Sequence, residues 1–272
     1  MIEILTEKLK AFHNKEDQFN YLREYLQLLI LRIMDERGFF RNLSFVGGTA
    51  LRILFDLNRF SEDLDFCLVE KTQYDFAKFM EIIQKELRLE NLSVEIKFKD
   101  KKNVASAFIK FNDLLYQLGL FPHKEKKLMV KFEVDQNPPN NFNTQISLVN
   151  KEFLLSINHF DLPSLFSGKL HALFCRKYTK GRDLYDFIWY LSKKIKPNFP
   201  LLNASFKQTE NINPHFNEET LILVLKEKVE AIDFFRVKED VAPFIIDQKE
   251  LRFFDKDLLL SFIEQYKQNI TK

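Results

Sequence analysis

A glycine pair and a closely spaced pair of aspartates constrain this 272-residue chain more than any other feature. Gly47-Gly48 lets the backbone approach a ligand closely, because neither residue has a Cβ atom and positive φ angles are allowed. Asp63 and Asp65 lie in an apolar run that predicts a strand, so both side chains project from one face. At an effective dielectric constant near 20, two carboxylates held that close repel each other by roughly 4 kcal/mol. A divalent cation between them would offset the repulsion, and phosphates at a glycine turn would complete a site for nucleotide chemistry.

The composition is typical of a helix-rich globular protein, with 46% hydrophobic residues, 30 Phe and only 6 Gly. The net charge of +2 is too small to indicate nucleic-acid binding by itself. Charges are scattered through the first ten residues, which argues against a signal peptide. The most apolar stretch, residues 25–34, is too short to span a bilayer. We therefore expect a cytoplasmic protein that does not use a membrane.

The cysteines and histidines do not predict a metal or redox centre. Cys67 and Cys175 cannot form a disulfide framework, and we expect two buried thiols in a reducing compartment. Neither cysteine lies in a Cys-x-x-Cys or Cys/His spacing. The same interpretation, incidental residues without ligand spacing, applies to four histidines: His123, His159, His171 and His215.

Hydrophobic periodicity predicts an α+β fold, in which a mixed or antiparallel sheet is flanked by helices and followed by a helical region. The sheet would occupy a core over residues 1–150, with a mainly helical region over 151–272 packed on it. The expected strands are 43–46, 64–69 and an antiparallel meander of 92–99, 105–111 and 128–135. The expected helices are 17–38, 49–57, 74–89, 162–178, 182–194, 218–234 and 256–266.

Four motifs in order resemble the signature of the AbiEii/AbiGii toxin family, a branch of the polymerase-β-like nucleotidyltransferases found in type IV toxin–antitoxin systems. They are Phe45 to Arg52, Arg59 to Phe66, Lys131 to Asp135 with an Asn-Pro-Pro behind it, and Gly168 to Phe187. The resemblance implies a nucleotidyltransferase core that uses an NTP as substrate and Mg²⁺ or Mn²⁺ as cofactor. Asp63 and Asp65 can hold one or two such ions through oxygen ligands.

A third acid usually completes such a site from a neighbouring strand. In the run 128–135, Lys131, Glu133 and Asp135 share one face. Glu133 is the first choice and Asp135 the second, and the chosen acid could act as general base on the attacking hydroxyl. The choice between the two stays open at this point.

Further residues are candidates for nucleotide binding. Gly47, Gly48 and Thr49 would form the phosphate-facing turn, with Gly48 or Thr49 near the cap of the helix that follows. Ser61 would cap or contact phosphate. Arg59 would pair with Asp63 or reach the nucleotide, or else lie on the surface.

Four residues between positions 169 and 186 enter through the resemblance. It implies that Lys169 holds the triphosphate, the alternative being a solvent-facing lysine. It also associates Arg182, Asp183 and Asp186 with the active site. The i, i+3 spacing puts both acids on one helical face. The alternative is an acidic cluster favoured by the helix dipole.

Lysines on the meander could form a cationic surface for a polyanion such as tRNA, or simply a solvated face. They are at positions 97, 99, 101, 102, 110, 124, 126 and 127. The leading hypothesis is the toxin of a toxin–antitoxin or phage-defence pair, which transfers a nucleotide from an NTP to RNA, with the tRNA 3′ end as best guess and a cognate antitoxin as partner. The alternatives are transfer to a protein or a small molecule such as an aminoglycoside, or a catalytically inactive nucleotide-binding module.

Overall fold

The computed structural model describes residues 1–270, which form two compact units. The first unit comprises residues 1–54, 60–138 and 145–159, and it contains the β-sheet. The second comprises residues 55–59, 139–144 and the chain from 160 onwards, and it is helical.

The sheet of the first unit has seven strands in the order β3-β4-β5-β2-β1-β7-β6. β2 pairs antiparallel with β1 and parallel with β5, whereas β3, β4 and β5 form an antiparallel meander. β1 pairs parallel with β7, so the sheet is mixed. The strands are β1 (Leu43–Val46), β2 (Asp63–Leu68), β3 (Val94–Lys99), β4 (Val104–Phe111), β5 (Leu128–Asp135), β6 (Thr144–Asn150) and β7 (Leu154–Phe160).

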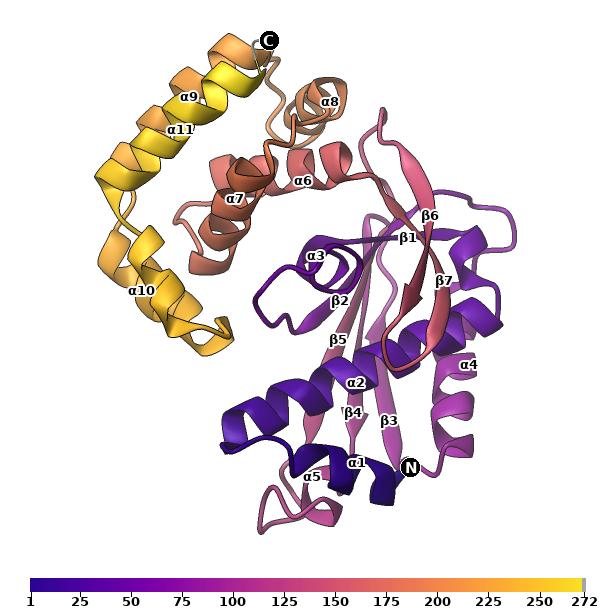
Figure 1. Cartoon of the computed structure of the whole chain (residues 1–272). Coiled ribbons are helices and arrows are strands. Elements are labelled where there is room, and N and C mark those ends of the chain that lie inside the picture. The colour runs from indigo at the N-terminus through magenta and orange to yellow at the C-terminus, as the bar shows by residue number, and fades with distance from the viewer. Residues whose placement is uncertain (271–272) are drawn as a thin grey trace. The chain divides into compact units, whose positions relative to one another are not determined.

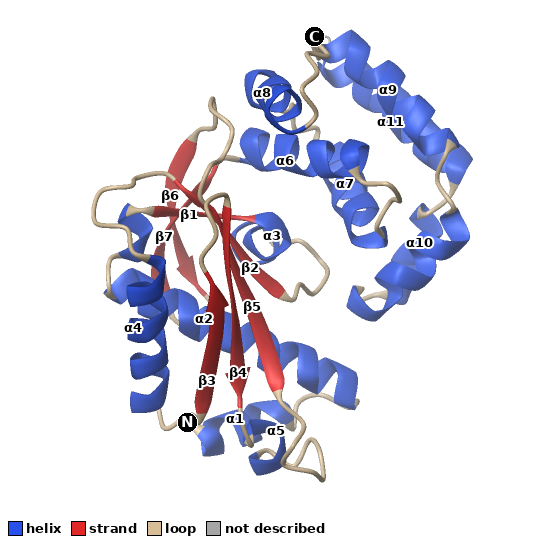
Figure 2. Ribbon diagram, turned by 180° about the vertical axis from the view of Figure 1, so that it is seen from behind, coloured by secondary structure: helices blue, strands red, loops and turns tan. Residues whose placement is uncertain are grey.

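Helices cover one face of the meander. α2 (Lys15–Glu36) crosses in front of β3, β4 and β5 in Figure 1 and lies behind them in Figure 2. α4 (Phe76–Leu89) packs on the same face, because its Phe76 ring contacts Phe98 of β3 and Phe132 of β5. The first unit also contains helices α1 (Ile2–Leu9), α3 (Gly47–Phe55) and α5 (Leu114–Gln117) and the short 3-10 helix η1 (Phe39–Arg41).

The other face of the meander is open, as period-two alternation requires. In β4, Ala105, Ala107 and Ile109 are fully buried, while Phe108 between them is 43% exposed. β5 repeats the pattern, with buried residues alternating with partly exposed ones. Burial of the apolar face is what fixes the register, because a slip of one residue would turn every side chain over. Polar side chains of β5 therefore lie on the open face.

The fold class predicted from the sequence is confirmed, and the five predicted strands match β1 to β5 to within two residues at either end. β6 and β7 were not predicted. β6 is an exposed strand at the sheet edge in which Ile146 and Leu148 are exposed, whereas in β7 buried residues alternate with partly exposed ones. The domain boundary predicted near residue 150 falls between these two strands and stays a prediction.

The second unit consists of helices that pack in pairs: α6 with α7 and α8, α7 with α10, and α9 with α11. Their bounds are α6 (Leu162–Cys175), α7 (Gly181–Lys193), α8 (Phe199–Thr209), α9 (Glu218–Glu230), α10 (Phe234–Val241) and α11 (Lys256–Ile270), with 3-10 helices η2 (Ala242–Phe244) and η3 (Gln248–Phe253). The single helix predicted over 218–234 is wrong at its end. Asp233 accepts a hydrogen bond from the Arg236 backbone N–H and so caps a new helix, α10. None of the helices in residues 1–270 is long and apolar enough to cross a membrane.

Candidate active site

The two predicted metal-binding aspartates lie on the open face of the sheet, beside the predicted third acid. In the β2–β5 register, Asp63 is opposite Lys131 and Asp65 is opposite Glu133. The intervening Leu64 is fully buried, so the aspartates face the open side. Three carboxylates and one ammonium group therefore lie together on two neighbouring strands.

Lys131 is the positive charge of this group, and sequence reasoning did not assign it a role. Its Nζ atom lies 2.6 Å from a carboxylate oxygen of Glu133. Burial lowers the pKa of Lys131, but Glu133, Asp63 and Asp65 outweigh that effect and hold the pKa above its ordinary value. The signal was available, because the alternation of β5 places Lys131 on the face of Glu133.

The glycine turn fits directly against Asp65. β1 ends at Val46 and α3 begins at Gly47, which has a φ of +80°. A Cβ atom at Gly47 would lie 2.3 Å from Oδ2 of Asp65, so only a glycine leaves room for this carboxylate. The first N–H groups of a helix lack intrahelical acceptors and favour anions. The turn therefore offers an anion-binding helix end next to a carboxylate.

Thr49 does not cap the helix as predicted, because α3 begins two residues earlier. Its hydroxyl instead donates a hydrogen bond to the backbone carbonyl of Asp63, which ties the turn to β2. Ser61 is held from the other side, since its carbonyl accepts a hydrogen bond from the buried Gln27 side chain at 3.1 Å. The N-terminal end of the Asp63–Asp65 segment is thus held by two side-chain contacts.

Asp135 lies one pair further along β5, opposite Cys67. It accepts a hydrogen bond from the Asn137 backbone N–H at 2.9 Å. Burial nevertheless raises the pKa of Asp135 above its ordinary value. By register, Glu133 is therefore the neighbour of Asp65, and Asp135 is the neighbour of Cys67.

In the helical unit, Asp186 is the centre of a buried ion network. Arg59 makes a bidentate pair with it, at 2.6 Å from Nε to Oδ1 and 2.7 Å from Nη2 to Oδ2. Lys169 of α6 adds a third contact, 2.7 Å from Nζ to Oδ2. Burial raises the pKa of Asp186, but Arg59 and Lys169 outweigh burial and hold the pKa below its ordinary value. The surface alternative for Arg59 is wrong, because the residue is 1% exposed.

Asp183 extends this network from the first turn of α7. Its carboxylate lies 3.6 Å from Lys169 Nζ and pairs with Arg176. The i, i+3 spacing of Asp183 and Asp186 therefore places both acids against one lysine, as the helical periodicity predicts. The solvent-facing alternative for Lys169 is wrong, because its side chain is only 16% exposed. The guanidinium of Arg182 lies over the Phe244 ring instead.

The predicted residues thus form two groups. One group, Gly47, Gly48, Thr49, Ser61, Asp63, Asp65, Glu133 and Asp135, belongs to the sheet unit. The other, Lys169, Arg182, Asp183 and Asp186, belongs to the helical unit.

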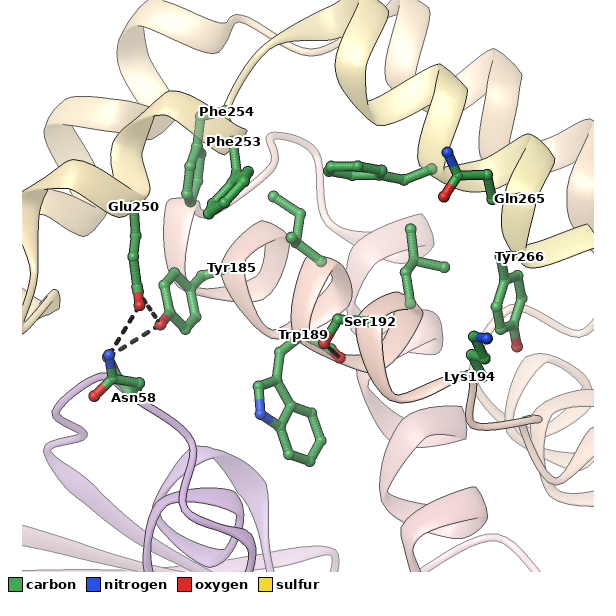
Figure 3. A pocket seen from close by; sticks show the side chains of 13 residues that line it. Asn58, Tyr185, Trp189, Ser192, Lys194, Glu250, Phe253, Phe254, Gln265 and Tyr266 are labelled. Carbon is green, nitrogen blue, oxygen red and sulfur yellow. Dashed lines mark hydrogen bonds between the residues drawn. The ribbon is translucent and has the colours of Figure 1, made fainter. Parts of the chain in front are cut away.

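The helical unit also contains a cavity of about 360 Å³, shown in Figure 3, and six of its thirteen lining residues are aromatic. Glu250 accepts hydrogen bonds there from the Asn58 side chain, at 2.9 Å, and from the Tyr185 hydroxyl. Burial and Glu250 raise the pKa of Tyr185, which stays a phenol at neutral pH. The lining includes none of the residues predicted from the sequence.

Comparison with known families identifies the family of this chain. A family model described as the nucleotidyl transferase AbiEii toxin of a type IV toxin–antitoxin system matches residues 29–259. The chain belongs to the AbiEii family. Membership supports a nucleotidyl-transfer toxin role and enzyme activity, and it suggests an NTP substrate and an antitoxin partner. It confirms the resemblance seen in the four motifs.

Two solved structures share the fold of the AbiEii chain. JHP933 from Helicobacter pylori has a TM-score of 0.56 at 18% identity, over 93% of this chain and 93% of its own. A second H. pylori protein, described only provisionally as a nucleotidyltransferase, has a TM-score of 0.57 at 18% identity, over 92% of this chain and 96% of its own. At this identity the likeness shows the fold alone. No curated protein matches the chain by sequence.

Proposed function

We propose that this AbiEii-family chain transfers a nucleotide from an NTP to RNA, with the tRNA 3′ end as acceptor, and that it acts as the toxin of a toxin–antitoxin pair. The observation that carries the proposal is the group of Asp63, Asp65 and Glu133 on the open sheet face, with the Gly47 turn fitted against Asp65. Phosphoryl and nucleotidyl transfer require mainly positioning and charge neutralisation, which such a group supplies.

The three carboxylates fit a divalent cation. They offer oxygen ligands, which Mg²⁺ and Mn²⁺ prefer, on adjacent strands and on the face that helices leave open. The glycine at position 47 keeps side-chain atoms away from the Asp65 carboxylate. Asp63, Asp65 and Glu133 would hold the ion, which when bound supplies charge neutralisation on the phosphates.

The protein's own groups would do the remaining work. The N-terminus of α3 would bind phosphate oxygens through its backbone N–H groups. Lys131 is placed to contribute a positive charge among the three carboxylates. Glu133 is the proposed third acid, because it is the neighbour of Asp65, and it would accept the proton of the attacking hydroxyl. Asp135 is the second choice.

We also propose that Lys169 contacts the triphosphate and that Arg182, Asp183 and Asp186 support it. The Lys169 ammonium group is held by Asp186 and Asp183, which would fix its position before the nucleotide binds. In a Lys169→Ala variant, calorimetry should show weaker NTP binding. Unchanged affinity together with a lower melting temperature would make Lys169 a purely structural residue.

The open sheet face favours a nucleic-acid acceptor over the alternatives. Phe108, in the middle of β4, is opposite Lys131 of β5 and Lys97 of β3. Its ring is 43% exposed although it lies inside the sheet. Single-stranded nucleic acids bind where aromatic rings for stacking alternate with cations for the backbone. The row formed by Lys131, Phe108 and Lys97 extends across the sheet from the three carboxylates, and a bound nucleic-acid strand could lie along it.

The test is incubation of the protein with each α-³²P-labelled NTP, total cellular RNA and total cellular protein. We expect label in tRNA-sized RNA, and a loss of transfer of roughly 1,000-fold or more in Asp63→Asn and Asp65→Asn, because several kcal/mol of charge stabilisation disappear. Glu81→Gln, an exposed acid on α4, is the control and should transfer normally. Label in protein or in a small molecule would show that this molecule, and not RNA, is the acceptor. No label with any acceptor would favour the inactive module, and transfer that survives EDTA would contradict the metal role.

A further inference from the structure

A second cluster of potential metal ligands lies in the helical unit, outside the residues discussed above. His171 and Cys175 are one turn apart on α6, and Glu210 follows the last residue of α8. A ring nitrogen of His171, the Cys175 sulfur and a Glu210 carboxylate oxygen all lie within 4.8 Å of one another. α6 and α8 lie against each other in both views of the unit (Figures 1 and 2).

Thr209 holds one ring nitrogen of His171. The Nε2 atom of the ring lies 2.8 Å from the Thr209 hydroxyl oxygen. The same hydroxyl lies 3.0 Å from the Ser205 carbonyl oxygen, to which it can donate its single proton. In that arrangement Nε2 donates to Thr209, and Nδ1 is the ring nitrogen with a lone pair for a metal. A histidine that binds a metal is usually oriented in this way, by a second group that accepts its other N–H.

The surroundings keep the cluster ordered and partly dry. The His171 ring packs edge-to-face on Phe206, at 5.1 Å between centroids, and Phe206 in turn contacts Phe174 and Phe216. Burial lowers the pKa of His171, so the imidazole is neutral at pH 7. Burial, together with Glu210, raises the pKa of Cys175 to about 11.

We infer that His171, Cys175 and Glu210 form a Zn²⁺ site with a fourth position open to water. One nitrogen, one thiolate sulfur and one carboxylate oxygen are a ligand set that zinc accepts in tetrahedral geometry. Binding balances as Zn²⁺ replaces the thiol proton: the ion gains a sulfur, a nitrogen and an oxygen ligand, and one proton is released to solvent. The site joins the last turn of α6 to the end of α8.

Cobalt(II) provides the first test, because a thiolate bound to Co²⁺ gives an intense ultraviolet charge-transfer band that oxygen ligands do not give. Metal-free protein titrated with Co²⁺ should show this band, saturating at one equivalent. Cys175→Ser should lose the band, and Glu210→Gln should weaken it. Cys67→Ser and His123→Gln are the controls and should keep it. The carboxylates of the sheet unit contain no sulfur, so Co²⁺ bound there does not produce the band.

Zinc itself provides the second test. Calorimetry in two buffers of different ionisation enthalpy should show about one proton released per Zn²⁺ by the wild type, and none at this site in Cys175→Ser. Zn²⁺ should also raise the melting temperature of the wild type more than that of Cys175→Ser, whose carboxylates in the sheet unit are intact and whose circular dichroism spectrum checks that it folds. Absence of the thiolate band at saturating Co²⁺, or its persistence in Cys175→Ser, would overturn the zinc site. Neither outcome depends on nucleotidyl transfer.

Discussion

At the scale of single residues, Gly47 meets two demands that no other amino acid satisfies together. Its backbone is in the left-handed region, at φ +80°, and its missing Cβ leaves room for Asp65. Gly119 meets only the first demand, because its φ is +68° and a Cβ there would contact nothing within 4 Å. A comparison of Gly47 with Gly119 therefore distinguishes the effect of backbone strain from the effect of the close contact with Asp65.

We expect Gly119→Ala to lower the free energy of unfolding by about 1–2 kcal/mol, the cost of a left-handed L-residue. Gly47→Ala should cost more, because its Cβ also collides with Asp65. Only Gly47→Ala should also lower kcat, by about a hundredfold, because it displaces Asp65. Denaturant unfolding and the labelled-NTP assay measure the two effects. Equal activity in both variants would mean that the turn does not position Asp65.

Asp186 makes the free energy of unfolding depend on pH. Its pKa is depressed in the folded protein, so the stabilisation that it contributes is complete above its unfolded pKa, near 3.9, and is lost as the pH falls through the lower folded value. We expect Asp186→Asn to cost roughly 3–5 kcal/mol of unfolding free energy at pH 7, since Arg59 and Lys169 lose their carboxylate.

Unfolding measured between pH 7 and pH 2 tests the role of Asp186. The difference between wild type and Asp186→Asn should shrink below about pH 4. Glu264→Gln, which removes an exposed pair between α9 and α11, is the control and should leave stability nearly unchanged at every pH. A constant difference down to pH 2 would show that Asp186 does not carry the charge in the network.

At the scale of elements, two glycines in helices have opposite surroundings. A Cβ atom at Gly181, the first residue of α7, would lie 2.1 Å from the Val237 carbonyl oxygen of α10. Gly168, inside α6, is exposed and would meet nothing within 4 Å. Close packing of α7 against α10 therefore depends on Gly181.

We expect Gly181→Ala to destabilise the protein by about 2 kcal/mol or more, because α10 must move away from α7. Gly168→Ala should stabilise it by about 0.5–1 kcal/mol, since alanine favours a helix interior. Thermal and denaturant unfolding measure both. A neutral Gly181→Ala would show that α10 is free to shift.

The elements also show what the sequence could and could not predict. Strands with one buried face were found from alternation, and so were the acids on them. β6 was missed because exposed apolar residues at a sheet edge break the alternation.

The Asp186–Arg59 pair joins residues 127 positions apart, so no local pattern could show it. The statement that neither cysteine has a Cys/His spacing overlooked His171 and Cys175, which are four residues apart on a predicted helix. Glu210 follows another helix, so its position near them had no local signal. The expectation of two buried thiols was wrong for Cys175, which is partly exposed.

At the scale of the whole molecule, a net charge of +2 means that any RNA affinity must come from local groups. Lys97 and Lys99 are exposed on β3, on the open face of the sheet. Lys78 and Lys85 are exposed on α4, the helix that packs on the opposite face of the sheet. The two pairs carry equal charge and differ in the face to which they belong.

We expect Lys97→Gln/Lys99→Gln to weaken RNA binding and to make the slope of log K against log salt shallower by about 1.4, or 0.7 for each phosphate that is no longer neutralised. Lys78→Gln/Lys85→Gln should change neither. Fluorescence anisotropy with a single-stranded RNA at several salt concentrations measures the slopes. Identical slopes for the two double variants would exclude the open face as the RNA-binding surface.

The direct passage from β1 into α3 has a thermodynamic consequence. Many phosphate sites lie on loops that become ordered when the ligand arrives, and fixing each loop residue costs about 1–2 kcal/mol of conformational entropy. Here the strand ends at Val46 and the helix begins at the next residue. Sheet pairing and helical hydrogen bonds therefore already hold the N–H groups in place. Phosphate binding at this junction therefore does not require these N–H groups to become ordered, although the loss of ligand motion still costs free energy.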